Sequence, residues 1–254
     1  MKLFRPLLLV GLLALGLLAQ AQSIFQVSTF NTLLGGVYGG TTTVGELLWN
    51  GNFGIGTFDA LDGEMIILDG VCYQITSEGK VNVMEKTATT PFAAVTSYQH
   101  EMSIVVVQPT SFADIEAMAD KLCGDNYFYA LRITGKFSKV KARSVPRQKL
   151  PYPPLAEVVK TQTVFNVPDG PGTMMGFRCP KFVAGINVPG YHLHYLSDDH
   201  KSGGHMLEGV LEQGVINIET IRSFQMNLPN TAEFQRANLT GDRAAETTAV
   251  EKGK

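Results

Sequence analysis

The chain has 254 residues, of which 44% are hydrophobic and 17% are charged, enough for one large or two modest globular domains. This composition excludes a disordered or fibrous protein. The formal net charge is −2 and no block of basic residues occurs, so the chain lacks the electrostatic footprint of a nucleic-acid-binding protein. We therefore expect a small-molecule partner.

Residues 1–21 have the features of a secretory signal peptide. Lys2 and Arg5 precede an apolar run over residues 6–18, and Ala19 and Ala21 supply the small residues that a signal peptidase requires. A membrane-spanning helix, the alternative, needs about 20 apolar residues, and this run is shorter. We expect cleavage after Ala21 and a secreted or periplasmic protein with no membrane anchor.

The first half of the mature chain predicts short strands and two helices. Thr43 and Glu46 form a capping-box pair, which indicates a helix that ends at Gly51. Asp-Gly and Glu-Gly turns then separate four segments of an antiparallel meander, at residues 52–58, 64–68, 71–76 and 81–85. Two more β-rich segments follow at 91–98 and 102–107. Ser111 should cap a helix over residues 112–123 that covers one face of this sheet.

A proline-rich stretch, residues 146–154, divides the chain. Before it we expect two strands that turn at Gly135, over residues 127–134 and 137–145. After it the predicted elements are strands at 163–167, 173–178 and 215–226, a helix at 231–238 and a polar tail. The sequence thus predicts an α/β (α+β) protein of two domains. These are a mixed-sheet N-terminal domain, residues 22–150, and a smaller β-rich C-terminal domain, residues 151–254, that binds metal.

The three cysteines do not form a recognisable site. Cys72, Cys123 and Cys179 are widely spaced and none belongs to a Cys-x-x-Cys motif. At most one disulfide bond is possible, and we expect buried core thiols rather than a nucleophile or a sulfur-ligated metal.

A histidine-rich hairpin is the clearest sign of chemistry. On a strand, His192 and His194 leave the same face about 6.5 Å apart, close enough to share one ion. A polar turn from Ser197 to Gly204 lets the chain double back, so that His205 approaches the pair as a third imidazole. Three neutral nitrogens suit Zn²⁺. The alternative is a surface hairpin with scattered histidines, which is the interpretation that we favour for His200.

Three motifs, in this order, resemble the acetolactate decarboxylase family over essentially the mature chain. They are GIGTFDALDGEM at 54–65, ARSVPRQ at 142–148, and GYHLH at 190–194 with GGH at 203–205. The resemblance implies a zinc-dependent lyase that converts 2-acetolactate to acetoin and carbon dioxide, built as a homodimer of two-domain α/β subunits. A zinc-stabilised enediolate would need no organic cofactor, because the cation stabilises charge that develops as the bond breaks.

The resemblance also implies a set of site residues. The zinc ligands are His192, His194 and His205. Glu64 and Arg143 face the metal from the other domain as catalytic residues, and Arg143 also binds substrate. Thr57 belongs to the substrate pocket, and Glu251 is a catalytic carboxylate of a tail that folds back over the site.

The residues alone leave alternatives open. Glu64 would more often be a solvated turn carboxylate, Arg147 competes with Arg143 for the pocket, and Glu251 lies in a segment whose composition is typical of a disordered tail. The spacing also suits a zinc hydrolase or isomerase that uses metal-bound hydroxide, or a non-catalytic binding module that a metal stabilises.

Overall fold

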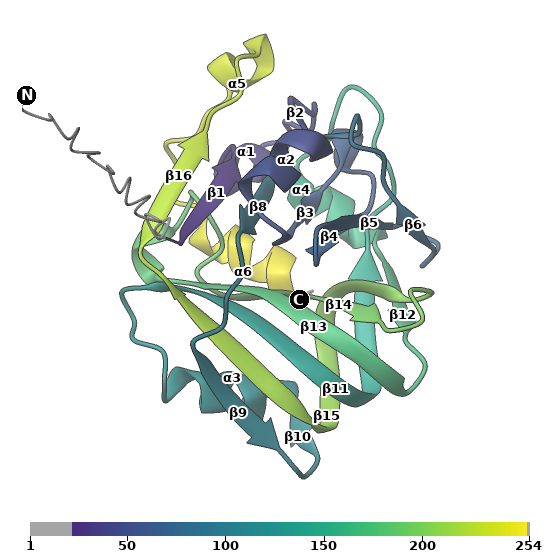
Figure 1. Cartoon of the computed structure of the whole chain (residues 1–254). Coiled ribbons are helices and arrows are strands. Elements are labelled where there is room, and N and C mark those ends of the chain that lie inside the picture. Colours follow the sequence, from purple (N-terminus) through teal and green to yellow (C-terminus); the bar gives the residue numbers. More distant parts are fainter. Residues whose placement is uncertain (1–21, 253–254) are drawn as a thin grey trace, which may run out of the picture.

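The computed structural model describes residues 22–252, and the expected signal peptide lies outside this part of the chain. The protein is a mixed α/β structure, rich in strands, with two main sheets that lie one above the other in Figure 1. Among residues 22–252, no helix has the length and apolar character to cross a membrane.

The first sheet has seven strands in the order β16-β1-β8-β3-β4-β5-β6. Their bounds are β1 Ser23–Val27, β3 Phe53–Thr57, β4 Glu64–Leu68, β5 Val71–Ile75, β6 Val81–Val83, β8 Ala93–Thr96 and β16 Ser223–Asn227. Strands β3 to β6 pair antiparallel in sequence order, which confirms the predicted meander. Because β1 and β16 are parallel, the sheet is mixed. A separate pair joins β2 Thr42–Thr43 to β7 Thr89–Thr90.

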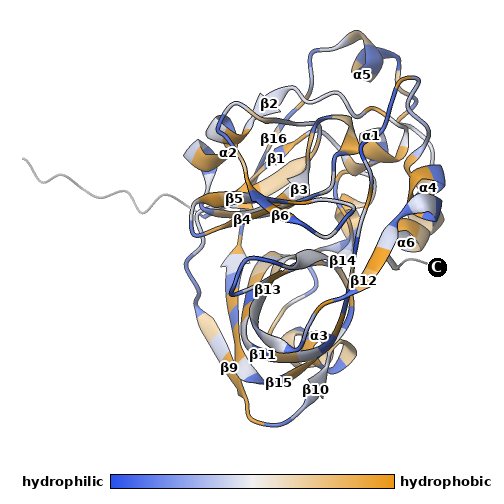
Figure 2. Ribbon diagram, turned by 90° about the vertical axis from the view of Figure 1, so that its right-hand side faces the viewer, coloured by the Kyte–Doolittle hydropathy of each residue, from blue (hydrophilic) through white to orange (hydrophobic). Residues whose placement is uncertain are grey.

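The second sheet closes on itself. Its strands are β9 Met102–Val106, β10 Thr110–Ser111, β11 Phe128–Ser144, β12 Thr163–Asn166, β13 Gly170–Cys179, β14 Gly190–Ser197 and β15 Gly203–Ile221. β11 pairs with both β13 and β15, and β14 also pairs with both, so these four strands form a small barrel. Figure 2 shows its curvature. We refer to this sheet as the barrel.

Six α-helices accompany the sheets in the described part of the chain: α1 Phe30–Leu34, α2 Val44–Asn50, α3 Phe112–Asp120, α4 Leu155–Val158, α5 Ala232–Arg236 and α6 Ala244–Lys252. The predicted capping box of Thr43 and Glu46 is confirmed at the start of α2. Ser111 caps α3 as predicted. However, α3 does not cover the meander: Ile115 and Ala119 pack into the core of the barrel, where the sheet offers a concave apolar face.

The expected turn at Gly135 is also wrong. Gly135 lies inside one long strand, β11, opposite Gly214 of β15 and Gly172 of β13. A Cβ atom at Gly135 would lie 2.2 Å from the backbone oxygen of Gln213. The glycine is required because neighbouring backbones approach closely, and not because the chain reverses there.

The strand pairing crosses the domain boundary predicted near residue 150. β9 and β11 precede that residue, yet both pair with β15, and the late strand β16 joins the first sheet. The physical reason is that closing the barrel leaves fewer unpaired strand edges, and this requires partners from both halves of the chain.

The layer between the sheets is apolar and contains one of the three thiols, that of Cys179. Phe53 and Ile55 of the first sheet meet Met175 and Phe177 of the barrel there. All three cysteines are free and buried, as predicted. Burial raises the pKa of the Cys72 and Cys179 thiols to about 12, which keeps both protonated and unreactive near neutral pH.

A buried carboxyl group in this layer should make stability depend on pH. Glu219 lies opposite Ala130 and is 0% exposed, and burial raises its pKa to about 7, against a backbone contact with Gln99 that lowers it. The unfolded chain releases this proton near pH 4.5, so folded protein binds more protons between about pH 4.5 and 7, and stability falls as pH rises through that window.

We expect Glu219→Gln to reduce this slope and to increase the free energy of unfolding at pH 8 by up to about 3 kcal/mol. Denaturant unfolding at pH 5, 6, 7 and 8 measures the free energy of unfolding and its dependence on pH. Glu208→Gln, an exposed site on the same strand, is the control and should keep the slope. An unchanged slope in Glu219→Gln would mean that another group is responsible.

Candidate metal centre and active site

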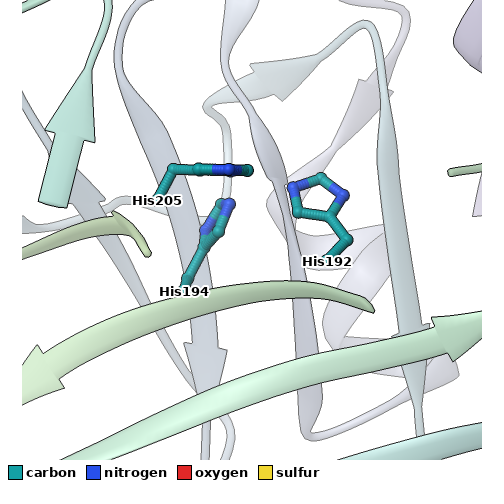
Figure 3. A group of neighbouring side chains, drawn as sticks. All are labelled: His192, His194 and His205. Atoms are coloured by element: carbon teal, nitrogen blue, oxygen red, sulfur yellow. The ribbon is translucent and has the colours of Figure 1, made fainter. Parts of the chain in front are cut away.

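Three histidine side chains from two neighbouring strands point at one another (Figure 3). His192 and His194 lie on β14, and His205 lies on β15 directly opposite His194. One ring nitrogen from each histidine lies within 4.8 Å of the others, and all three side chains are buried. The predicted convergence of the three imidazoles is therefore confirmed.

Local structure explains this convergence. Alternation along β14 places both of its histidines on the face toward the first sheet. A turn then returns the chain, with the Ser197 hydroxyl donating to Asp199 and accepting from the backbone N–H of Ser202. His200 is exposed in this turn, as predicted, and its ring contacts that of Tyr73 at a tilt of 55°. Gly204 has a φ of +138°, and a Cβ there would lie 2.6 Å from the Arg143 carbonyl oxygen, so glycine allows β15 to approach β11.

The three histidines have the chemistry of metal ligands. The Nδ1–H of His194 donates to the backbone oxygen of Met65 at 2.9 Å, which leaves Nε2 as a lone-pair nitrogen. That Nε2 atom is buried and has no hydrogen-bond partner within residues 22–252. Burial and the nearby Arg143 lower the pKa of His192 to about 3, and burial lowers the pKa of His194 and His205 strongly. Neutral imidazoles with free lone pairs fit a bound divalent cation.

Two buried carboxyl groups face the histidine cluster. An Oε2 atom of Glu64, on β4, lies 3.6 Å from His194 Nε2. The Oε2 atom of Glu251, on α6, lies 3.7 Å from His192 Nε2 and 3.9 Å from His205 Nε2. Burial raises the pKa of both carboxyl groups to about 7, and the charge of Arg143 opposes both shifts. Glu64 is therefore buried at the site and is not the solvated turn carboxylate that its sequence position suggests.

Arg143, rather than Arg147, lies at the site. Arg143 pairs in register with His205 and is 4% exposed, and its Nη2 atom donates to the Val250 carbonyl at 3.0 Å. Arg147 lies at the surface and pairs with Asp59 and Asp62. We expected Arg143 to face the metal from a different domain, but β11 belongs to the same barrel as the histidines, whereas Glu64 comes from the first sheet.

A small cavity of about 40 Å³ is lined by His192, His205, Glu64, Glu251 and Arg143. Thr57, buried at the end of β3, also lines it, while its hydroxyl donates to the Gly63 carbonyl at 2.7 Å. A larger cavity, about 800 Å³, adjoins His205 and Glu251 from the side of α3.

Sequence reasoning missed the apolar wall of the small cavity. Its members include Phe30 and Leu33 of α1, Leu155 of α4, Val250 of α6, and Phe92, which directly precedes β8. They have the pattern of ordinary core residues, so no local signal distinguishes them. Only the assembly of distant segments gives them a place at the site.

Comparisons with known proteins agree on one family. The profile of the family described as alpha-acetolactate decarboxylase matches residues 24–241. A curated protein of that name from Methanosarcina mazei is 42% identical over 90% of this chain and 80% of its own length. One from Bacillus subtilis strain 168 is 39% identical over 91% of both chains. A crystal structure of alpha-acetolactate decarboxylase from Bacillus subtilis strain 168 aligns with a TM-score of 0.88 and 39% identity, covering 91% of this chain and all of that one.

Proposed function

Since the chain belongs to the alpha-acetolactate decarboxylase family, and is thus a carboxy-lyase, we propose which of its residues carry out the conversion of 2-acetolactate to acetoin and carbon dioxide. The observation that carries the proposal is the buried cluster of three neutral histidines, which faces two carboxyl groups and one arginine.

His192, His194 and His205 would hold a Zn²⁺ ion, the metal that three imidazoles suit best. When bound, the ion would supply a Lewis acid that stabilises negative charge on a substrate oxygen. The hydrogen bond from His194 to the Met65 backbone supports this role, because it fixes the tautomer with Nε2 free. The Glu251 carbonyl oxygen, 3.1 Å from His205 Nε2, would have to give up this contact if that nitrogen became a ligand.

Arg143 would bind the carboxylate of the substrate. Its guanidinium lines the small cavity and is held by the Val250 carbonyl, with its Nε atom left without a hydrogen-bond partner in the described chain. A planar fork of donors suits a carboxylate better than a point charge does. The apolar wall around it would keep water from the reacting carbon atoms.

Glu64 and Glu251 would carry out the proton transfer that completes the reaction. As the bond to the carboxylate carbon breaks, the electron pair moves toward the neighbouring ketone, and the carbon left behind must then receive a proton on one face. The two carboxyl groups reach the histidine cluster from different elements, Glu64 from β4 beside His194 and Glu251 from α6 beside His192, so either could serve as the proton donor.

Substrate would reach the site by displacing part of the tail. An apolar cavity of about 150 Å³ is needed to hold benzene, which is smaller than 2-acetolactate. The small cavity, at about 40 Å³, is too small for this substrate, whereas the larger cavity meets it at His205 and Glu251. We propose that the substrate approaches from the larger cavity as Glu251 moves.

The sequence further supports export and self-association as proposals. Residues 1–21 have the composition of a secretory signal, and the resemblance to the family implies a homodimer. N-terminal sequencing of the mature protein and its mass in solution by light scattering test these two proposals separately.

The activity is tested with purified protein and racemic 2-acetolactate, with acetoin as the measured product. We expect acetoin well above the spontaneous rate, loss of this activity with a chelator, and recovery on adding Zn²⁺. Folded, zinc-loaded protein that forms acetoin only at the spontaneous rate would contradict the proposal. Unfolding by the chelator would instead indicate a structural metal.

A further inference from the structure

The C-terminal helix α6 carries Glu251 to the site, although the helix is short. α6 has nine residues, and an isolated helix of that length is marginal in water. It begins after residue 241, where the match to the family profile ends. Contacts with the rest of the protein must therefore hold α6 in place. Figure 2 shows α6 beside α4, on the side of the molecule where α1 also lies.

At its C-terminal end, α6 is held by one apolar residue and two carbonyls. Val250 is 1% exposed and packs in the cluster that contains Phe30, Leu33 and Leu155. The Val250 carbonyl accepts from Arg143, and the Glu251 carbonyl oxygen lies 3.1 Å from His205 Nε2. Thr247, one turn earlier, is also buried. These contacts fix where the last turn lies, and the first turn requires an anchor of its own to set the direction of the helix axis.

At its N-terminal end, α6 is held by Arg243. The Nη1 atom donates to the Asn31 carbonyl at 3.2 Å, and Nη2 donates to the Leu34 carbonyl at 3.3 Å. The Leu34 carbonyl lies at the C-terminal end of α1, where a cation is favoured, and the Asn31 carbonyl also accepts from the backbone N–H of Gly35. Glu246, one turn into α6, accepts from Nε at 2.7 Å and from Nη2 at 3.1 Å, so the guanidinium is fixed from two sides.

Arg243 also takes part in the first turn of α6. The Arg243 carbonyl accepts from the backbone N–H of Thr247 at 2.8 Å, so the first turn of α6 is continuous with the residue that grips α1. Eight residues separate Arg243 from Glu251, a helical rise of about 12 Å. Because Val250 and Glu251 are neighbours in the last turn, a tilt of the helix axis about Val250 reorients the Glu251 side chain relative to His192 and His205.

We propose that Arg243 is a positioning residue: by clamping the start of α6 to the carbonyl end of α1, it sets the Glu251 carboxyl group against the histidine cluster. This inference rests on the proposed catalytic role of Glu251. Arg243 itself lies outside both cavity linings and does not touch the site.

A double-mutant cycle tests the proposal in the zinc-loaded full-length protein. We expect Arg243→Ala to lower kcat by up to about 100-fold, the loss that a misplacement of about 1 Å can cause. In a Glu251→Gln background, the same substitution should have almost no further effect, because the group that it positions is already disabled. Arg236→Ala, at an exposed arginine of α5, is the matched control and should leave kcat unchanged. Zinc content should be equal in all variants.

Hydrogen exchange supplies a second readout, and we expect amides 247–251 to exchange faster in Arg243→Ala. If that variant does not fold, Arg243→Lys takes its place, since it keeps the charge but loses the two-pronged contact, and the same non-additivity is expected. The proposal that Arg243 positions Glu251 is rejected if Arg243→Ala lowers kcat equally in the Glu251→Gln background, or if it does not lower kcat at all. An unimpaired Glu251→Gln single variant would instead reject the role proposed for Glu251.

Discussion

Replacing His194 with alanine is expected to remove the metal and to reduce acetoin formation to the spontaneous rate. His194 is the most enclosed of the three histidines, with an exposed fraction of 0%, and its Nε2 atom faces both the other imidazoles and Glu64. Loss of a hydrogen bond that merely orients a ligand lowers metal affinity about 10- to 100-fold, so loss of the ligand itself should cost more. Metal content by elemental analysis and acetoin formation are measured on the same sample.

His200→Ala is the matched control for this experiment. His200 lies in the turn between β14 and β15 and is exposed, so its loss should change neither metal content nor rate. If His194→Ala retains stoichiometric zinc and full activity, the histidine cluster is not the metal centre. Thermal unfolding of both variants separates loss of the ligand from loss of the fold.

Glu64→Gln is expected to retain zinc and to lower kcat by about 10²- to 10⁴-fold, the usual contribution of a positioned acid or base. The amide keeps the size of the side chain and its place in the small cavity, but it cannot exchange a proton. Burial raises the pKa of Glu64 to about 7, so a neutral amide resembles the protonated form that the carboxyl group already populates near neutral pH, and we expect the metal ligands to stay in place. Steady-state kinetics and zinc analysis measure the two effects.

Glu85→Gln, at an exposed position just after β6, controls for the change of charge on the same sheet. If the Glu64→Gln enzyme keeps the wild-type kcat, we would assign the proton transfer to Glu251 alone. An enzyme that loses zinc together with activity would show instead that Glu64 supports the metal.

Local patterns predicted most of the local structure. The capping box of α2, the turns of the meander and the alternation of His192 and His194 each depend on a few neighbouring residues, so the sequence is enough to locate them. Gly135 shows where such reasoning fails. A glycine between two apolar segments predicts a turn, and only the neighbouring strands reveal that its role is to let three backbones lie close together.

Different residues of the candidate site could be predicted for different reasons. The histidines could be inferred from spacing, whereas Glu64, Arg143 and Glu251 entered only through resemblance to a family, since each has a more common structural role. The choice between Arg143 and Arg147 depends on which side of β11 faces the histidines and on the carbonyl of Val250, which lies more than a hundred residues away. Such long-range contacts leave no trace in a local pattern.

The partner that fixes the tautomer of His194 is a main-chain atom, the carbonyl oxygen of Met65. Scanning mutagenesis exchanges side chains and leaves carbonyls in place, so a substitution of Met65, which is 0% exposed, would report on core packing and not on this hydrogen bond. The orientation of the His194 ring thus depends on the path of the β4 backbone rather than on the identity of a neighbouring side chain.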